Sequence, residues 1–244
     1  MNPTTQSNGS PKMPLRAPLW IAVYVVAMSA FESLVPEAAV ALWRAPLVAA
    51  LSLALVIALR KRDAFAFYGF VRPRPGALRA ALYGLPLVAL ATVNLWHGVT
   101  LRYGPLETAA YVAAMVGVGF LEETIFRGLL LKELLRRSER LAVIVSSVTF
   151  GLGHIVNLLS GAATLDTAAQ VVYAIAVGFM LSVFVLRVGS ILPCVAFHAL
   201  FNSLSAFGVE GSDRDSLVVA GAITLLALAY AVRLWRMPRR DPRN

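Results

Sequence analysis

The sequence predicts an all-α fold: a polytopic membrane helix bundle with about eight transmembrane helices and both termini in the cytoplasm. Of the 244 residues, 59% are hydrophobic and only 14% are charged, whereas ordinary soluble domains carry about 25% charged residues. The apolar residues also run in blocks of roughly 17 to 25, the length that a helix needs to cross the hydrocarbon core of a bilayer.

Eight segments are expected to span the membrane, and together they form one bundle over residues 17–236. Residues 1–16 are polar and Pro-rich and predict a disordered tail, and residues 237–244 predict a basic tail. The third and sixth segments contain internal Gly or Pro, which neighbouring helices can accommodate. The fifth and seventh are short and polar and are expected to line a cavity. The segments are residues 17–36, 45–59, 77–97, 107–131, 141–159, 165–186, 190–207 and 216–236.

The distribution of basic residues predicts the orientation. Of the 22 Lys and Arg residues, 18 lie in the two terminal segments or after the second, fourth and sixth spans. Only Arg44, Arg102 and Arg214 fall on the other side, and Arg127 lies inside a span. Because positive charge favours the cytoplasmic side, both termini are expected there. This topology signal also explains the net charge of +9 without a nucleic-acid partner.

Two adjacent acids and an arginine stand inside the fourth span. Glu123 and Arg127 are four residues apart, so they share a helix face and are expected to pair. Adjacent helix residues point about 100° apart, so Glu122 and Glu123 are not expected to face one point. Glu122 is therefore left for the site, although swapped roles are possible. The alternative is a structural salt bridge with one spare acid, which hydrocarbon disfavours.

Two histidine motifs follow on separate spans. Phe150 lies one turn before His154 and can pack on its imidazole, while Gly151 and Gly153 are expected to admit a neighbouring helix. His198 and Asn202 are also four residues apart and share a face, aimed at the same cavity. Helix rise places the acids and both histidines roughly 14 to 20 Å from the cytoplasmic surface, and a water-filled opening to the cytoplasm is expected. Packing histidines and an interhelical hydrogen bond are the structural alternatives.

Two chemistries fit this residue set. Glu122 can act as a general base on water while His198 and Asn202 stabilise the oxyanion of an attacked amide. Alternatively, Glu122, His154 and His198 could bind zinc with water in the fourth position. The helical H-E-x-x-H signature of zinc proteases is absent from the sequence, but the residues alone leave both chemistries open.

Three other polar residues are given no catalytic role. The single cysteine, Cys194, is expected to be a small buried hydrophobic residue, with a thiol nucleophile beside His198 as the minor alternative. His97 lies beside Trp96 and is expected at the external interface. Glu32 lies near the external end of the first span and is expected to snorkel or pair there.

The three motifs resemble those of the CPBP family, the CAAX-processing and bacteriocin-processing intramembrane proteases, also called the Abi family. EETIFR, FGLGH and HALFN fit the family pattern E-E-x-x-x-R, F-x-x-x-H and H-x-x-x-N/D in the right order. The resemblance covers about residues 108–206. It implies a helical endopeptidase whose first glutamate activates water and whose histidines and asparagine complete the site. That site would comprise Glu122, Glu123, Arg127, His154, His198 and Asn202.

The expected function is thus intramembrane endopeptidase activity, by a glutamate-type or a metallo mechanism. The protein would act in the cell membrane on a membrane-associated protein or peptide substrate, with no nucleic acid and no certain cofactor, zinc being possible. A non-catalytic scaffold or bacteriocin-immunity protein is the main alternative. An ion-coupled transporter is a weaker one, because no repeated halves with broken helices are evident.

Overall fold

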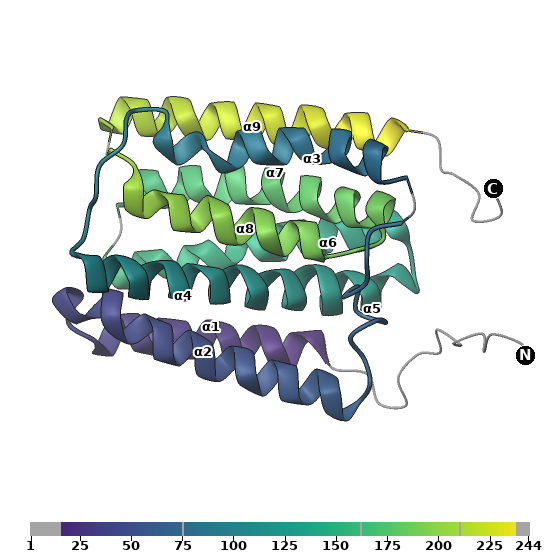
Figure 1. Ribbon diagram of the computed structural model, residues 1–244, viewed down its shortest axis with the longest axis horizontal. Coiled ribbons are helices and arrows are strands. Elements are labelled where there is room, and N and C mark those ends of the chain that lie inside the picture. Colours follow the sequence, from purple (N-terminus) through teal and green to yellow (C-terminus); the bar gives the residue numbers. More distant parts are fainter. Residues whose placement is uncertain (1–15, 75, 162, 210, 238–244) are drawn as a thin grey trace, which may run out of the picture.

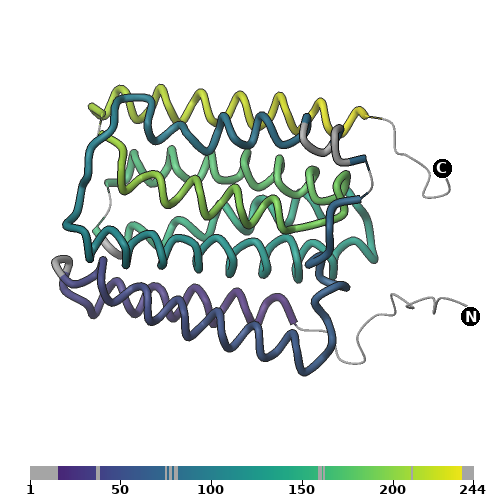
Figure 2. The backbone as a smooth tube through the Cα atoms, viewed as in Figure 1, coloured from purple at the N-terminus to yellow at the C-terminus, as the bar shows by residue number. Residues whose placement is uncertain are grey.

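The computed structural model describes residues 16–74, 76–161, 163–209 and 211–237, and in these ranges the protein is helical apart from loops and one β-bridge. The helices run side by side along the length of the molecule (Figures 1 and 2). Most of both predicted tails, residues 1–15 and 238–244, lies outside the described residues.

The first half of the chain contributes helices to both sides of the bundle (Figure 1). It contains α1 (Ala17–Leu34), α2 (Glu37–Lys61), α3 (Ala77–Ala91) with the 3₁₀ turn η1 (Val93–Leu95), and α4 (Pro105–Glu123). A π-helix, η2 (Thr124–Leu130), extends α4 into the short α5 (Leu131–Leu135). Pro46 and Pro86 lie inside α2 and α3, as neighbouring helices in a membrane bundle allow.

The second half contains α6 (Glu139–Leu152), the 3₁₀ segment η3 (Gly153–Ser160), α7 (Thr164–Val188), α8 (Leu192–Leu204), the 3₁₀ turn η4 (Ser205–Phe207) and α9 (Asp213–Arg236). Local sequence sets several helix ends. Ser212 and Asp215 form a capping box at the start of α9. Gly189 ends α7 in the left-handed conformation with φ at 77°, which residues other than glycine rarely adopt.

Within the described ranges, six helical segments are long and apolar enough to cross a membrane, so a multi-pass membrane protein is confirmed: Ala17–Leu34, Ala39–Lys61, Pro105–Leu135, Glu139–Leu158, Thr164–Val188 and Asp213–Arg236. The third and seventh predicted spans correspond to shorter apolar helices, 82–95 and 192–207. The predicted count of eight membrane crossings therefore requires that these two shorter helices cross the membrane as well. Large apolar side chains on the outer helices face outward, as contact with lipid requires.

Two apolar cores support the bundle, and the polar residues predicted to be functional lie between them. One core joins α3, α7, α8 and α9, and includes Cys194 and Phe197 next to His198. The other joins α1, α2, α4 and η2, and includes Leu121 and Ile125 on either side of the glutamate pair. Because α4 packs against both α2 and α8, it carries its acids to the boundary of the two cores (Figure 1).

Candidate active site

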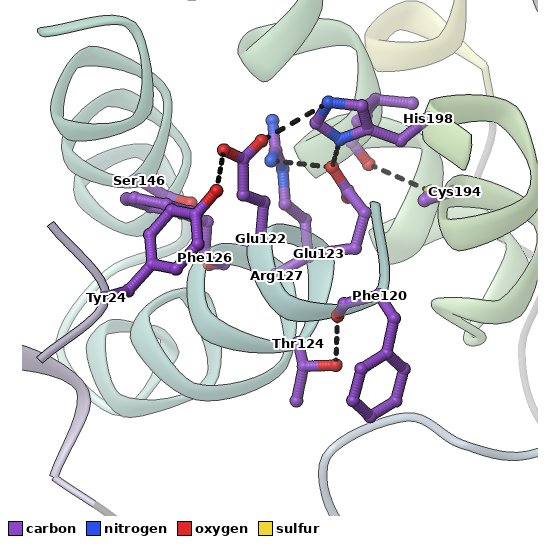
Figure 3. Close-up of polar contacts among 11 residues, drawn as sticks. Tyr24, Phe120, Glu122, Glu123, Thr124, Phe126, Arg127, Ser146, Cys194 and His198 are labelled. Atoms are coloured by element: carbon purple, nitrogen blue, oxygen red, sulfur yellow. Dashed lines mark hydrogen bonds and ion pairs between the residues drawn. The ribbon is translucent and has the colours of Figure 1, made fainter. Parts of the chain in front are cut away.

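Glu123 is the fixed centre of the polar cluster (Figure 3). Its Oε1 lies 2.9 Å from Nη1 of Arg127 and 2.9 Å from Nδ1 of His198. The ion pair predicted from the four-residue spacing is thus present, and both of its side chains are fully buried. Because a carboxylate paired with arginine can only accept, the Nδ1–H of His198 donates to Glu123 and fixes the imidazole ring.

Glu122 holds the opposite edge of the same ring. Its Oε2 lies 3.3 Å from Nε2 of His198, and its Oε1 accepts a hydrogen bond of 2.7 Å from the hydroxyl of Tyr24 (Figure 3). The expectation that the two adjacent glutamates could not face one point is therefore wrong. The physical reason is the size of the imidazole: its two nitrogens lie on different edges of the ring, so two carboxylates that diverge from α4 still contact one side chain.

Phe150 connects the histidines to the arginine. Its ring makes edge contacts with the His154 and His198 rings, at centroid distances of 5.3 and 5.7 Å. The guanidinium of Arg127 lies over the Phe150 ring at 4.2 Å. Such a cation–π contact supports a buried guanidinium whose Nε and Nη2 have no hydrogen-bond partner among the described residues. The predicted packing of Phe150 on His154 is confirmed. Phe150 also contacts His198 and Arg127, which belong to the other two motifs.

Helix contacts bring the motifs together. A Cβ on Gly119 of α4 would lie 2.7 Å from the backbone nitrogen of Ala199, so glycine lets α8 approach and His198 reach the acids. Gly151 likewise lets α6 approach α7, since a Cβ there would lie 2.8 Å from the nitrogen of Ile175. The same expectation for Gly153 is wrong. No described atom lies within 4 Å of the position that its Cβ would take, and Gly153 borders the cavity instead.

A cavity of about 270 Å³ lies directly beside Glu122 and His154. One wall is apolar, and the lining continues along α1 to the ion pair of Glu32 with Arg44, whose closest atoms are 2.6 Å apart. The lining thus extends toward the α1–α2 turn rather than toward the loops that carry most of the basic residues. The lining residues are Tyr24, Val25, Met28, Ser29, Glu32, Arg44, Glu122, Phe126, Phe150, Gly153, His154, Val156 and Asn157.

The structure brings five of the six predicted site residues into one group, and Asn202 is the one that it does not connect to the others. His198 borders Glu122 but does not line the cavity, and neither does Asn202. Among the described residues, no hydrogen bond joins the Asn202 side chain to the other five. Cys194 is fully buried, with its Sγ 3.9 Å from the Leu181 carbonyl. It lies outside the cavity lining, as expected of a packing residue.

Glu122 and His198, two of the three ligands predicted for a zinc site, lie directly beside each other in this arrangement. Nδ1 of His198 lies 2.9 Å from a Glu123 oxygen, and its Nε2 lies 3.3 Å from a Glu122 oxygen. Within the part of the chain that the structure describes, no group of three or more His, Cys, Asp or Glu side chains has the geometry to hold a metal. The arrangement therefore gives the zinc alternative no support.

Sequence reasoning missed three contributors from outside the motifs, Tyr24 and the pair of Glu32 with Arg44. Tyr24 taken singly carried no signal, because a tyrosine in an apolar span is ordinary near a membrane interface. Glu32 and Arg44 did carry a signal, since intramembrane charges are rare. The sequence alone gives Glu32 no catalytic role and makes Arg44 only a marker of topology. The helical spacing of Tyr24, Met28 and Glu32 places them on one face of α1, and that regularity could have indicated a cavity wall.

Fold and site together define a multi-pass helical membrane protein with a buried cluster of acids, histidines and an arginine. Residues 104–204 match the family model of Rce1-like proteins, the type II CAAX prenyl endopeptidases. This match contains all three motifs and confirms that this segment is similar to the CAAX proteases of the CPBP family. No curated protein and no solved structure matches the chain.

Proposed function

We propose that this protein is an intramembrane endopeptidase in which Glu122 activates a water molecule. The supporting observation is that Glu122 and His154 line one cavity among membrane-spanning helices, with His198 3.3 Å from the Glu122 carboxylate. A peptide bond in this cavity would meet a carboxylate base and an imidazole at one place, which is the minimum that metal-free amide hydrolysis requires.

The proposed reaction uses Glu122 twice. The carboxylate takes a proton from water as the water oxygen attacks the carbonyl carbon of the substrate. When the tetrahedral intermediate collapses, the carbon–nitrogen bond breaks and Glu122 returns the proton to the leaving amine. Glu123 does not contact the cavity, and its part is to hold Arg127 and the His198 ring.

Two groups are proposed to stabilise the negative oxygen of the intermediate, and of these only His154 lines the cavity. His154 lines the cavity beside Glu122, and His198 presents its Nε2 to the same carboxylate. Hydrogen bonds from such preorganised donors stabilise an oxyanion most strongly where water is excluded. Asn202 remains a predicted member of this set, one turn beyond His198 on α8.

The substrate class follows from the surroundings of the cavity. Apolar side chains of α1 and η3 line it together with polar groups, and the helices around it belong to a multi-pass membrane protein. A membrane-embedded or membrane-anchored peptide can reach such a site with its apolar residues still covered. We therefore propose substrates of this kind.

Purified protein in proteoliposomes should cleave a library of membrane-anchored peptides, tested with and without a prenyl group. Glu122→Gln is expected to lower kcat by roughly 10²- to 10⁴-fold, the usual contribution of a general base. His154→Ala and His198→Ala should also impair cleavage. Glu107→Gln, in the first turn of the same helix, is the matched control and should retain activity.

The possible outcomes of this experiment distinguish the proposed endopeptidase from a membrane scaffold and from a zinc-dependent enzyme. Cleavage lost in all three site variants but kept in Glu107→Gln supports the endopeptidase. Absence of cleavage by the wild-type protein, with a cellular phenotype that survives all three substitutions, would contradict it and support a membrane scaffold. Activity that a chelator abolishes and zinc restores would contradict water activation by Glu122 alone.

A further inference from the structure

Helix α1 lies outside the segment that matches the family model, yet it forms one wall of the cavity. The match covers residues 104–204, whereas α1 spans Ala17–Leu34. Five of its residues line the cavity, and α1 contacts η3, which carries His154, and η2, which carries Arg127. The matched segment alone would therefore leave Glu122 open on this side.

Tyr24 is the point at which α1 meets the acid. In this helix only Ala17 and Tyr24 are buried, and the other described side chains are partly or fully exposed. The Tyr24 hydroxyl donates to Oε1 of Glu122 at 2.7 Å across 98 positions of sequence (Figure 3). This distance is the usual one for a well-formed O–H···O hydrogen bond.

Because of this hydrogen bond, the two carboxylate oxygens of Glu122 have different partners. Oε1 is directed to Tyr24 and Oε2 to His198, so the plane of the carboxylate is set from both sides. Hydrogen bonds to charged groups are among the stronger ones in proteins, and a base acts efficiently only when its lone pairs face the proton that it takes.

We propose that Tyr24 is a positioning residue of the active site, whose hydroxyl holds the Glu122 carboxylate in the orientation needed to take a proton from water. The inference rests on the proposed endopeptidase function. It extends the active site beyond the motif-bearing segment to the first membrane helix, and it makes α1 a part of the catalytic unit.

The test compares two buried tyrosines that differ in location. Tyr24 and Tyr230 are each 9% exposed, and each donates one hydroxyl hydrogen bond, Tyr230 to the backbone carbonyl of Tyr83. Tyr24→Phe and Tyr230→Phe each remove one oxygen atom and leave the ring. Both variants and the wild-type protein would be assayed with the same peptide in proteoliposomes, and thermal unfolding would be recorded for all three.

Tyr24→Phe is expected to lower kcat about 10- to 100-fold with KM changed less than about twofold, because the hydroxyl acts on the base and not on the substrate. Tyr230→Phe should keep kcat while losing a comparable amount of thermal stability. A merely structural Tyr24 would give both variants the same kcat.

The outcomes separate this inference from the proposed function. Cleavage by the wild-type protein that Tyr24→Phe leaves unchanged overturns the role of Tyr24 alone. No cleavage by the wild-type protein overturns both. If Tyr24→Phe fails to fold, a fluorinated tyrosine at position 24 keeps the ring and the hydroxyl but alters its acidity. A kcat that changes there, and not at position 230, supports the inference, and an unchanged kcat overturns it.

Discussion

Arg127 and Glu123 form an ion pair with no exposed side-chain surface, and His198 makes it a triad. The protein has a second glutamate–arginine pair, Glu32 with Arg44, whose side chains are 22% and 20% exposed. The two pairs have the same chemistry and differ in burial. Substitutions in the two pairs therefore allow a direct comparison of the free-energy cost of removing a counter-charge at a buried and at a partly exposed site.

Arg127→Met is expected to destabilise the protein by about 3–5 kcal/mol, because it leaves the buried Glu123 carboxylate without its counter-charge. Arg44→Met should cost less than about 1 kcal/mol, since solvent screens the partly exposed pair. The free energies of unfolding would be measured by denaturant titration in mixed micelles. Equal losses in the two variants would contradict the assignment of Glu123 and Arg127 as a buried structural pair.

A change of helix type distinguishes the element that carries the first motif. Directly after Glu123 the chain passes from α-helix into the π-helix η2, which contains Arg127. The Ser146 hydroxyl of α6 donates to the Phe126 carbonyl at 2.8 Å and fastens this segment to the next helix. π-Helical turns occur mainly at functional sites, and this one sets the direction of Arg127 toward Phe150.

The contact between α4 and α8 gives a prediction at the scale of elements. Gly119→Ala places a Cβ 2.7 Å from the backbone nitrogen of Ala199, so α8 must move and carry His198 away from Glu123. We expect kcat to fall at least about tenfold, since displaced catalytic groups lose rate steeply. The peptide assay in proteoliposomes measures this loss.

Gly221→Ala in α9 is the control for that variant, because no described atom lies within 4 Å of the position that its Cβ would take. It should keep kcat and raise stability by about 0.5–1 kcal/mol, the usual gain of alanine over glycine in a helix. A Gly119→Ala protein as active as Gly221→Ala would show that α8 does not need this close approach.

The whole molecule has an asymmetric distribution of charge. The start of α1 and the end of α9 lie at the same end of the bundle (Figure 1), and the loops α2–α3, α5–α6 and α7–α8 share that end. Those loops and helix ends carry most of the basic residues of the described chain. The positive-inside rule predicts that this end faces the cytoplasm.

Cysteine labelling tests that orientation. In a Cys194→Ala background, Thr100→Cys and Arg137→Cys place one exposed thiol at each end of the bundle. A membrane-impermeant maleimide added to intact cells should label position 100 and leave position 137 unlabelled until the cells are permeabilised. The reverse pattern would place the basic end outside and contradict the predicted topology.

Much of the site could be predicted from residues close together in the sequence. The pairing of Glu123 with Arg127 and the packing of Phe150 on His154 each follow from one helix turn, and both are present. Contacts between distant residues could not be derived in this way. Tyr24 meets Glu122 across 98 positions, and Glu123 meets His198 across 75, so only the packing of helices determines them.

The sequence by itself determined that this protein is a bundle of membrane helices bearing three polar motifs, because the length of an apolar run and the spacing along one helix are local properties. The tertiary structure alone decided that one imidazole lies between both glutamates, that α1 lines the cavity with Tyr24, and that Asn202 does not line it. These features depend on how closely helices approach one another, and that distance is set by side-chain packing between elements far apart in the chain.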